Sequence, residues 1–556
     1  MKRRDVMTRR SSLRQMRLSN PVKVVIGVVV LLFLFAPWRR APRLTITADE
    51  LSRLWTVPRE EVAERYEAAR TAALHQRGYN AKKAARSVRA PRKFGDGSET
   101  FDASVDAYTK RLRKFVSHTL ASSTSRLAFE DSLSRLARFA PPRGAPLPRA
   151  LFSTDRAGDS GVADLYRLWN ALLPLPVEQE LAALLPETAW AEPARKGGTW
   201  SSIIADDGQI DAQVSEWLGA SVFDQESAWG HTWEQLEFGV LRADVYRYMA
   251  ILFSGGVYAD SDTAPIAHPY FWGLNAKCIT HPDLVALEQI LAYHEKGIDT
   301  TNRRVWERGL PDNETEAEPA KRFSPPYPGV HRHERRAPFR FNREPVPPED
   351  ATTLLSPDIN VVVAVEFDSS IAWDWRRWMM WSPQRFRRSW KNSGGGRSLQ
   401  FTQYVLSSKP NHPIFIDTLA TIMDLVNVEA QKETPTLGAL DLTGPGPFSD
   451  AVLRYLIVRY GVTPDQLRNV KGPVRVGDVL ILQEEAMLAP DTAIQQLLTH
   501  VRSFFPSLPG SGAARSVPGE SLWYWGTGYR SWRSGGRRVL FHGLSGRWKG
   551  QGWNED

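Results

Sequence analysis

Two aspartates one residue apart, Asp260 and Asp262, are the residues of this chain best suited to chemistry. They follow Gly255–Gly256 and the apolar segment 257–259, which predicts a short strand. Alternate residues of a strand share a face, so both carboxylates can reach one hard cation that keeps room for phosphates and water. The pair therefore predicts a metal-diphosphate site, the chemistry that a nucleotide-sugar donor needs, although a lone Asp-x-Asp also occurs in turns and surface loops.

A predicted helix positions this pair. Apolar residues at helical spacing run from Tyr246 to Phe253, and the glycines at 255 and 256 can end the helix with positive φ. Asp244 and Arg247 precede or open this apolar stretch. Without a ligand, they would be a helix N-terminal aspartate and a surface arginine.

The segment 242–262 resembles the core of glycosyltransferase family 32, an R-x-D-x-x-R-Y helix followed by G-G-[IV]-Y-x-D-x-D. The resemblance implies that Asp244 and Arg247 hold sugar and phosphate groups of the donor. It also implies that Asp260 contacts sugar or ribose and that Asp262 binds the metal directly. The residues it assigns to donor binding are Arg242, Asp244, Arg247, Gly255, Gly256, Tyr258 and Asp260, with Asp260 and Asp262 at the catalytic centre.

Further segments resemble the alpha-1,6-mannosyltransferases of that family. Residues 398–404 resemble an aromatic Q-[FW]-x-Q-[WY] helix, and 409–414 a K-P-x-H-P-I turn. Residues 442–452 resemble T-G-P-G-x-[WF]-[ST]-D-A-[VI], where Ser449 and Asp450 could equally cap a helix. Residues 476–482 resemble a G-D-V-x-[VI]-L-P strand, with Gln483 in place of proline. Candidate acceptor or donor contacts are Asp206, Asp207, Thr443, Asp450 and Trp548.

A histidine near the C-terminus is a third candidate metal ligand. The apolar residues 539–541 predict a short strand that ends at His542, within an H-x-x-x-G-x-W pattern. A neutral imidazole could complete a Mn²⁺ shell with Asp262 and Asp260. The alternative is an ordinary surface histidine.

The N-terminus predicts a membrane anchor. Residues 22–38 form an apolar run of about 17 residues, in which Lys23 can snorkel. The preceding tail is strongly basic, so the positive-inside rule places 1–21 in the cytosol and the remainder in the lumen. A cleaved signal peptide is the alternative, but 37–40 makes a poor cleavage site. We expect a single-pass type II protein of the Golgi membrane.

Composition suits a large lumenal enzyme. The chain has 556 residues, 42% hydrophobic residues and a net charge of +9, which comes largely from the N-terminal tail and Arg-rich loops. No nucleic-acid motif accompanies that charge. Cys278 is the only cysteine, which excludes intramolecular disulfides, and Asn313 is the one N-glycosylation acceptor found.

Strand and helix signals alternate after residue 146, which predicts an α/β fold with a mostly parallel sheet and flanking helices. Strands are expected at 147–154 and 200–205, and ligands bind such sheets at the carboxyl ends, where Asp206 and Asp260 lie. The resemblance makes this fold the GT-A type. The expected organisation is a cytosolic tail (1–21), an anchor (22–38), a partly helical stem (39–145) and a catalytic domain (146–556) with a disordered insertion at 300–350.

The resemblance implies metal-dependent, retaining transfer of mannose from GDP-mannose to a mannose of an N-linked glycan, in alpha-1,6 linkage, with Mn²⁺ or Mg²⁺ as cofactor. This transfer would begin outer-chain elongation in the Golgi. Other mannosyltransferase subunits are further candidate partners. Three alternatives stay open: another acceptor, such as inositol phosphoceramide or a different glycan; another nucleotide-sugar donor; or a non-catalytic lumenal protein that keeps the fold.

Overall fold

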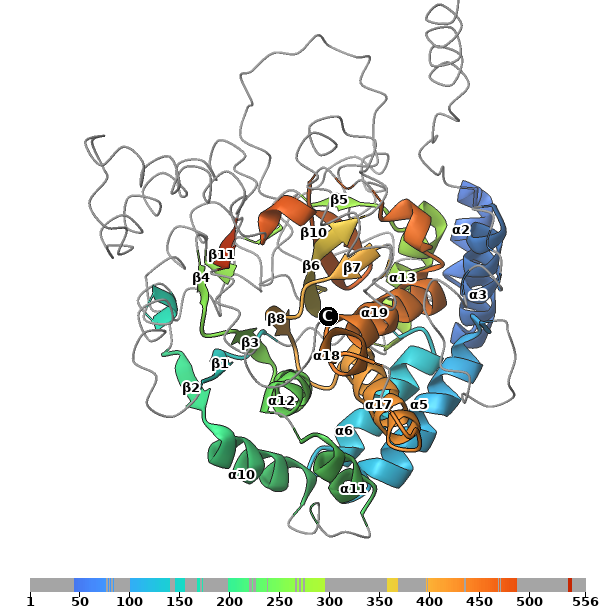
Figure 1. The fold of residues 1–556 in the computed structure, drawn as a ribbon. Coiled ribbons are helices and arrows are strands. Elements are labelled where there is room, and N and C mark those ends of the chain that lie inside the picture. Colours follow the sequence, from blue (N-terminus) through green and yellow to red (C-terminus); the bar gives the residue numbers. More distant parts are fainter. Residues whose placement is uncertain are drawn as a thin grey trace, which may run out of the picture. The chain divides into compact units, whose positions relative to one another are not determined.

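A computed structural model describes most of the residues that carry these motifs (Figure 1). Apart from a few positions between them, the described ranges are 45–76, 101–140, 146–155, 199–219, 227–237, 239–265, 276–295, 358–368, 399–434, 437–468, 472–487 and 539–542. No helix within these ranges is long and apolar enough to cross a bilayer. The expected anchor, the insertion at 300–350, Asn313 and Trp548 lie outside them.

A mixed sheet forms the centre of the unit Thr45–Asp556. Its strands follow the order β2-β1-β3-β8-β6-β10-β9-β5, with β7 paired to β6. β2, β1, β3, β6 and β10 run in one direction, and β8 is reversed between β3 and β6. The predicted α/β class with a mostly parallel sheet is therefore confirmed. The bounds are β1 Ala150–Thr154, β2 Ser201–Ala205, β3 Gly256–Ala259, β5 Lys277–Cys278, β6 Val361–Asp368, β7 Leu399–Phe401, β8 Val405–Ser408, β9 Val474–Val476 and β10 Val479–Leu482.

Helices gather on one side of this sheet, and a small second sheet of β4 and β11 lies toward the other (Figure 1). The helices are α2 Ala48–Leu54, α3 Arg59–Gln76, α5 Val105–Thr119, α6 Arg126–Ala137, α10 Asp207–Leu218, α11 Ala228–Gln235, α12 Gly239–Phe253, α13 Pro282–Glu295, α17 Pro413–Glu429, α18 Ala439–Leu442 and α19 Pro445–Tyr460. The small strands are β4 Thr263–Pro265 and β11 Leu540–His542.

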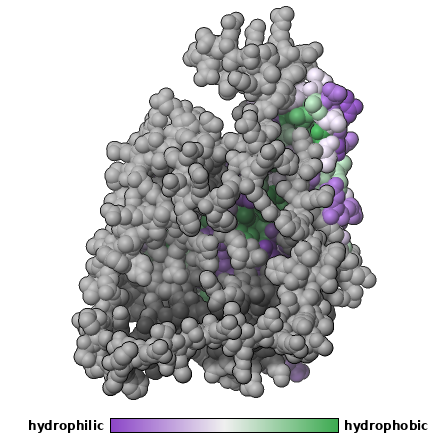
Figure 2. Space-filling model, turned by 90° about the horizontal axis from the view of Figure 1, so that it is seen from above, coloured by the Kyte–Doolittle hydropathy of each residue, from purple (hydrophilic) through white to green (hydrophobic). Residues whose placement is uncertain are grey.

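Strand β6 shows how the sheet is buried on both faces. Val361 and Val363 join the core shared with the helices, whereas Val362 and Ala364 join a second core on the opposite face. A strand covered on both faces needs a nearly continuous apolar sequence, which the run Val-Val-Val-Ala-Val supplies. Seen from above, the described residues at the surface mix hydrophobic and hydrophilic types in small areas (Figure 2).

The N-terminal helices belong to the same core as the sheet. Helix α3 packs against α13, and α5 packs against α17. Asp417 of α17 is fully buried and binds the guanidinium of Arg454, while the hydroxyl of Tyr108 in α5 donates to it at 3.0 Å. Residues 39–145, predicted to be partly helical, thus contain α2, α3, α5 and α6, and the buried hydrogen bond from Tyr108 joins α5 to α17.

Two local predictions are wrong. The segment resembling an aromatic helix at 398–404 instead contains strand β7, because Leu399–Phe401 pairs with β6. Helix α19 begins at Pro445, so Ser449 and Asp450 lie inside the helix and do not cap it. The K-P-x-H-P-I segment forms the predicted turn before α17, in which His412 is the N-cap.

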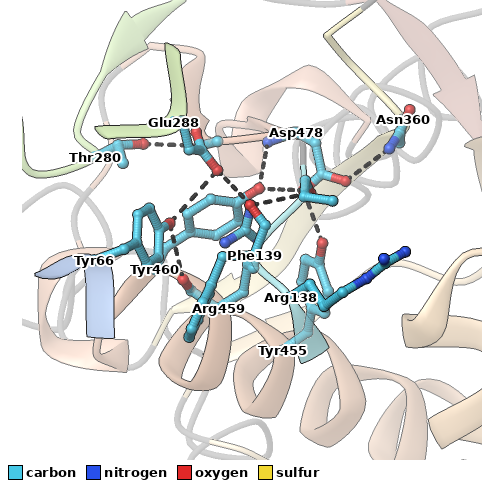
Figure 3. A network of polar contacts seen from close by, with 12 residues as sticks. Tyr66, Arg138, Phe139, Thr280, Glu288, Asn360, Tyr455, Arg459, Tyr460 and Asp478 are labelled. Atoms are coloured by element: carbon cyan, nitrogen blue, oxygen red, sulfur yellow. Dashed lines mark hydrogen bonds and ion pairs between the residues drawn. The ribbon is translucent and has the colours of Figure 1, made fainter. Parts of the chain in front are cut away.

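A buried polar network fixes the turn between β9 and β10 (Figure 3). Asp478 accepts hydrogen bonds from Tyr460 (2.8 Å), Tyr455 (3.0 Å), Asn360 (2.9 Å) and His412 (3.1 Å). The preceding residue must be glycine, because a Cβ there would lie 1.9 Å from the Tyr460 ring. Burial alone would raise the pKa of Asp478, but the hydrogen bonds outweigh burial and lower that pKa to about 2.

We expect Asp478→Ala to reduce the free energy of unfolding by about 3–5 kcal/mol, since four buried donors lose their acceptor. The carboxylate's contribution is complete above its unfolded pKa of about 3.9 and is lost as pH falls through about 2. The difference between wild type and variant should therefore shrink below pH ~4. Urea unfolding at several pH values measures it. Asp465→Ala, at an exposed ion pair, is the control, and an equal loss in both variants would contradict the prediction.

Candidate active site

The site begins where α12 passes into β3. Gly255 and Gly256 have φ of 68° and 102°, as the sequence predicts for the end of this helix. A Cβ on Gly256 would lie 2.4 Å from the backbone oxygen of Ala150 in the neighbouring strand β1. The glycines therefore allow α12 to turn tightly into the sheet, so packing alone accounts for both. The carboxyl ends of β1, β2 and β3 then meet at one edge of the sheet.

Arg247 is the centre of the polar network at this edge. Its guanidinium lies 2.9 Å from Asp244, one helical turn earlier, and 3.3 Å from Asp260 at the end of β3. It also lies over the ring of Tyr258, 5.1 Å from the centroid. The arginine is only 5% exposed, and its Nε finds no hydrogen-bond partner among the described residues. A buried cation with a donor left over can bind an anion or a sugar hydroxyl.

Asp244 is held in place from two other segments. Thr443 Oγ1 donates to one carboxylate oxygen at 2.9 Å, and Gln403 Nε2 donates to the other at 3.2 Å. Burial raises the pKa of Asp244 to about 6, although Arg247 and these hydrogen bonds oppose that rise. These contacts fix the orientation of the Asp244 carboxylate, and its pKa of about 6 lies just below neutral pH.

The two tyrosines of the motif complete the network. Tyr258 donates to Asp260 Oδ1 at 2.9 Å and lies 3.0 Å from Thr154 Oγ1, at the end of β1. Tyr248 donates to the side chain of Gln403 and to the backbone oxygen of Gly444 at 3.0 Å. Three segments that the sequence analysis identifies, at 242–262, 398–404 and 442–452, therefore converge on one site.

The Asp-x-Asp pair adopts a turn, not the extended strand on which its shared face was predicted. Strand β3 ends at Ala259, and the backbone N–H of Thr263 donates to the Asp260 carbonyl at 3.0 Å. The Asp260 N–H in turn donates to Tyr404 of the loop before β8 at 2.8 Å. Asp260 keeps about a quarter of its side chain exposed, and Asp262 is half-buried, so both face the accessible side of the network.

The donor set at this turn suits a cation shared with a substrate. The described residues contain no group of three or more side chains placed to hold a metal by themselves. Ions of the Mg²⁺ type are commonly held by one or two carboxylates, with substrate phosphates and water as the other ligands. Asp260 contacts Arg247 and Tyr258, and the direct contact of Asp262 with a metal stays a prediction.

The predicted strand that ends at His542 is confirmed by β11, and its position bears on the metal site. β11 pairs antiparallel with β4, and His542 lies opposite Thr263, the residue after Asp262. The backbone of His542 is therefore beside the Asp-x-Asp turn. Its role as a ligand stays a prediction.

Four other candidates lie apart from this network. Arg242 donates to the backbone oxygen of Leu236 at 2.9 Å and lies over the Trp233 ring, so it packs against the α11 end. Asp450, which lies inside α19, forms a buried ion pair with Arg397 at 2.6 Å. Asp206 lies at the predicted sheet edge, but its carboxylate caps α10 and accepts from Gln209 N at 2.8 Å, while Asp207 is the exposed first residue of that helix.

Gln403 was not assigned to the site by sequence analysis, although the motif at 398–404 contains it. Its amide contacts Asp244 and Tyr248, and its backbone oxygen accepts from Arg247 at 3.4 Å. Only the repeated Gln spacing in that motif could have pointed to it.

Comparisons with known proteins relate the chain to glycosyltransferases. No family model matches. The initiation-specific alpha-1,6-mannosyltransferase of Schizosaccharomyces pombe is 23% identical over 315 residues, which is 56% of this chain and 53% of that protein. The putative glycosyltransferase HOC1 of Saccharomyces cerevisiae is 25% identical over 166 residues, 27% of this chain and 37% of that protein. The chain thus spans about half or less of the length of these curated relatives.

Proposed function

We propose that this chain is a retaining glycosyltransferase of the GT-A type, in family 32, that transfers mannose from GDP-mannose to a mannose of an N-linked glycan in alpha-1,6 linkage. The proposal includes a type II anchor at 22–38 and a lumenal, Golgi-located catalytic domain. The observation that carries it is the buried network in which Arg247 joins Asp244 to Asp260, beside the Asp262 turn. The names of the two relatives support the sugar-transfer part.

The network supplies the two kinds of contact that a nucleotide sugar needs. Asp244, fixed by Thr443 and Gln403, accepts hydrogen bonds from sugar hydroxyls. Arg247 is buried and its Nε has no hydrogen-bond partner among the described residues, so it donates to a phosphate or hydroxyl of the donor. Asp260 and Asp262 lie on the accessible side, where Asp262 and His542 would hold Mn²⁺ or Mg²⁺.

The proposed reaction is a front-face displacement assisted by the departing diphosphate. The acceptor hydroxyl attacks the anomeric carbon from the face on which the diphosphate departs, and its proton passes to the departing phosphate oxygen. The carbon–oxygen bond to the diphosphate breaks, which gives GDP and a glycoside of unchanged configuration. A cation held by Asp262 and His542 would offset the negative charge that develops on the diphosphate. Arg247 is placed to stabilise the same charge.

Donor turnover tests this proposal. The purified chain is incubated with Mn²⁺ and each of a set of nucleotide sugars, with and without mannose oligosaccharide, and nucleotide release is measured. We expect release from GDP-mannose to exceed release from the other donors by at least about tenfold, because a fixed polar site discriminates hydroxyl positions. Equal or absent release from all donors would contradict the proposal, and preference for another donor would correct its sugar.

A further inference from the structure

A carboxylate that no motif includes lies near the same edge of the sheet. Glu366 is close to the carboxyl end of β6, the central strand that runs in the direction of β3. Ser407 of β8 pairs with Val257 on one side and with Val362 on the other. Val257 and Val362 are therefore level across β8; Glu366 lies four residues further along β6, and the aspartate turn follows the end of β3 at Ala259. Two strand spacings, roughly 10 Å, separate the backbones.

One short segment joins Glu366's strand to the donor network. The backbone N–H of Thr402 donates to Ala364 O of β6 at 2.9 Å, and Asp260 N donates to Tyr404 O at 2.8 Å. Between them lies Gln403, which holds Asp244. The position of β6 relative to the donor network is therefore fixed by hydrogen bonds on both sides of a three-residue bridge.

The backbone is irregular at Glu366 itself. The pairing of β6 with β7 shifts register between Val365 and Phe367, which is the mark of a β-bulge with Glu366 as the extra residue. Bulges re-aim a side chain and are frequent beside active sites. The side chain is half-buried in the described structure, whereas Val365 before it is fully in the core.

One partner of Glu366 is an amide side chain. Gln400 Nε2 donates to Glu366 Oε2 at 2.9 Å, so an amide and a carboxylate lie side by side. Sugar hydroxyls both donate and accept, and such a pair offers an acceptor and a donor together. Burial raises the pKa of Tyr404, and the negative charges of Glu366, Asp260 and Asp262 act in the same direction.

We infer that Glu366 and Gln400 form a subsite for hydroxyl groups of the acceptor sugar, across β8 from the donor network. A carboxylate accepts hydrogen bonds from the hydroxyls of a neutral sugar. Arg247 contacts Asp244 and Asp260 in the donor network. Because Glu366 lies on the other side of β8, its position suits the acceptor sugar. This inference rests on the proposed sugar transfer and names the residues that bind its second substrate.

The test is Glu366→Gln, which keeps the side-chain volume and removes the charge. We expect the KM for a mannose oligosaccharide to rise at least about tenfold, because its hydroxyl groups lose their hydrogen bonds to the charged carboxylate of Glu366. Donor hydrolysis without acceptor and binding of GDP should stay within about twofold of wild type. Glu50→Gln is the control, since Glu50 is also half-buried and its carboxylate contacts Arg65, and all its values should match wild type.

Two outcomes overturn the inference. An unchanged acceptor KM in a folded Glu366→Gln variant would show that the pair is structural. An equal loss of GDP binding would place Glu366 on the donor side. Failure of the proposed function is recognised separately, because then wild type itself transfers no sugar from any donor.

Discussion

Asp262→Asn is expected to abolish Mn²⁺-dependent binding of GDP and to lower the transfer rate by at least about a thousandfold. Asparagine has nearly the same shape but lacks the charge that a divalent cation requires. Because Asp262 is half-buried in a turn, its replacement should cost at most about 1 kcal/mol of folding free energy. Calorimetric titration of GDP with and without Mn²⁺ measures the effect.

Asp49→Asn is the control for this variant, since Asp49 is an exposed aspartate in the first turn of α2. It should leave GDP binding unchanged. Normal Mn²⁺-dependent GDP binding and near-normal turnover in Asp262→Asn would remove Asp262 from the metal site.

Arg247→Met should lower kcat/KM for the donor by at least about a thousandfold, or roughly 4 kcal/mol, if the guanidinium meets the donor in a site without water. A second effect acts through Asp244, whose pKa of about 6 is held down by Arg247. Without the arginine this pKa rises further, so the carboxyl is protonated near neutral pH and loses acceptor capacity.

Stability must be measured alongside this variant, because removing one partner of a buried ion pair costs about 3–5 kcal/mol. Arg135→Met is the control, since Arg135 is also mostly buried and lies 2.8 Å from Glu295. If the folded Arg247→Met protein keeps donor affinity and rate within about threefold of wild type, the arginine is structural.

The sequence predicts the local part of this site well, for physical reasons. Glycine at 255 and 256 and the apolar run before them leave few conformations other than a helix that ends and turns into a strand. His412 and Pro413 similarly fix the start of α17. The family resemblance assigns Asp244, Arg247 and Asp260 to one site. In the structure they are in contact, between a helix and the end of a strand.

Long-range contacts could not be predicted from local pattern. Residues 399–401 become a strand because β6 offers a pairing edge, which overrides their helical resemblance. The sequence near Asp450 is typical of a cap or a ligand. Its partner Arg397 lies 53 residues earlier in the chain, so local pattern does not indicate this ion pair. Arg242 and Arg247 share one helix, yet only the packing of α11 shows which arginine faces the network.

A crystal structure of the chain with GDP and Mn²⁺ bound tests the central claim most directly. We expect the ion against Asp262, the diphosphate within hydrogen-bond distance of the Arg247 guanidinium or of the ion, and an open space beside Asp244 for the sugar. A nucleotide bound elsewhere, with the Asp244–Arg247–Asp260 network unchanged and the aspartate turn free of metal, would contradict it.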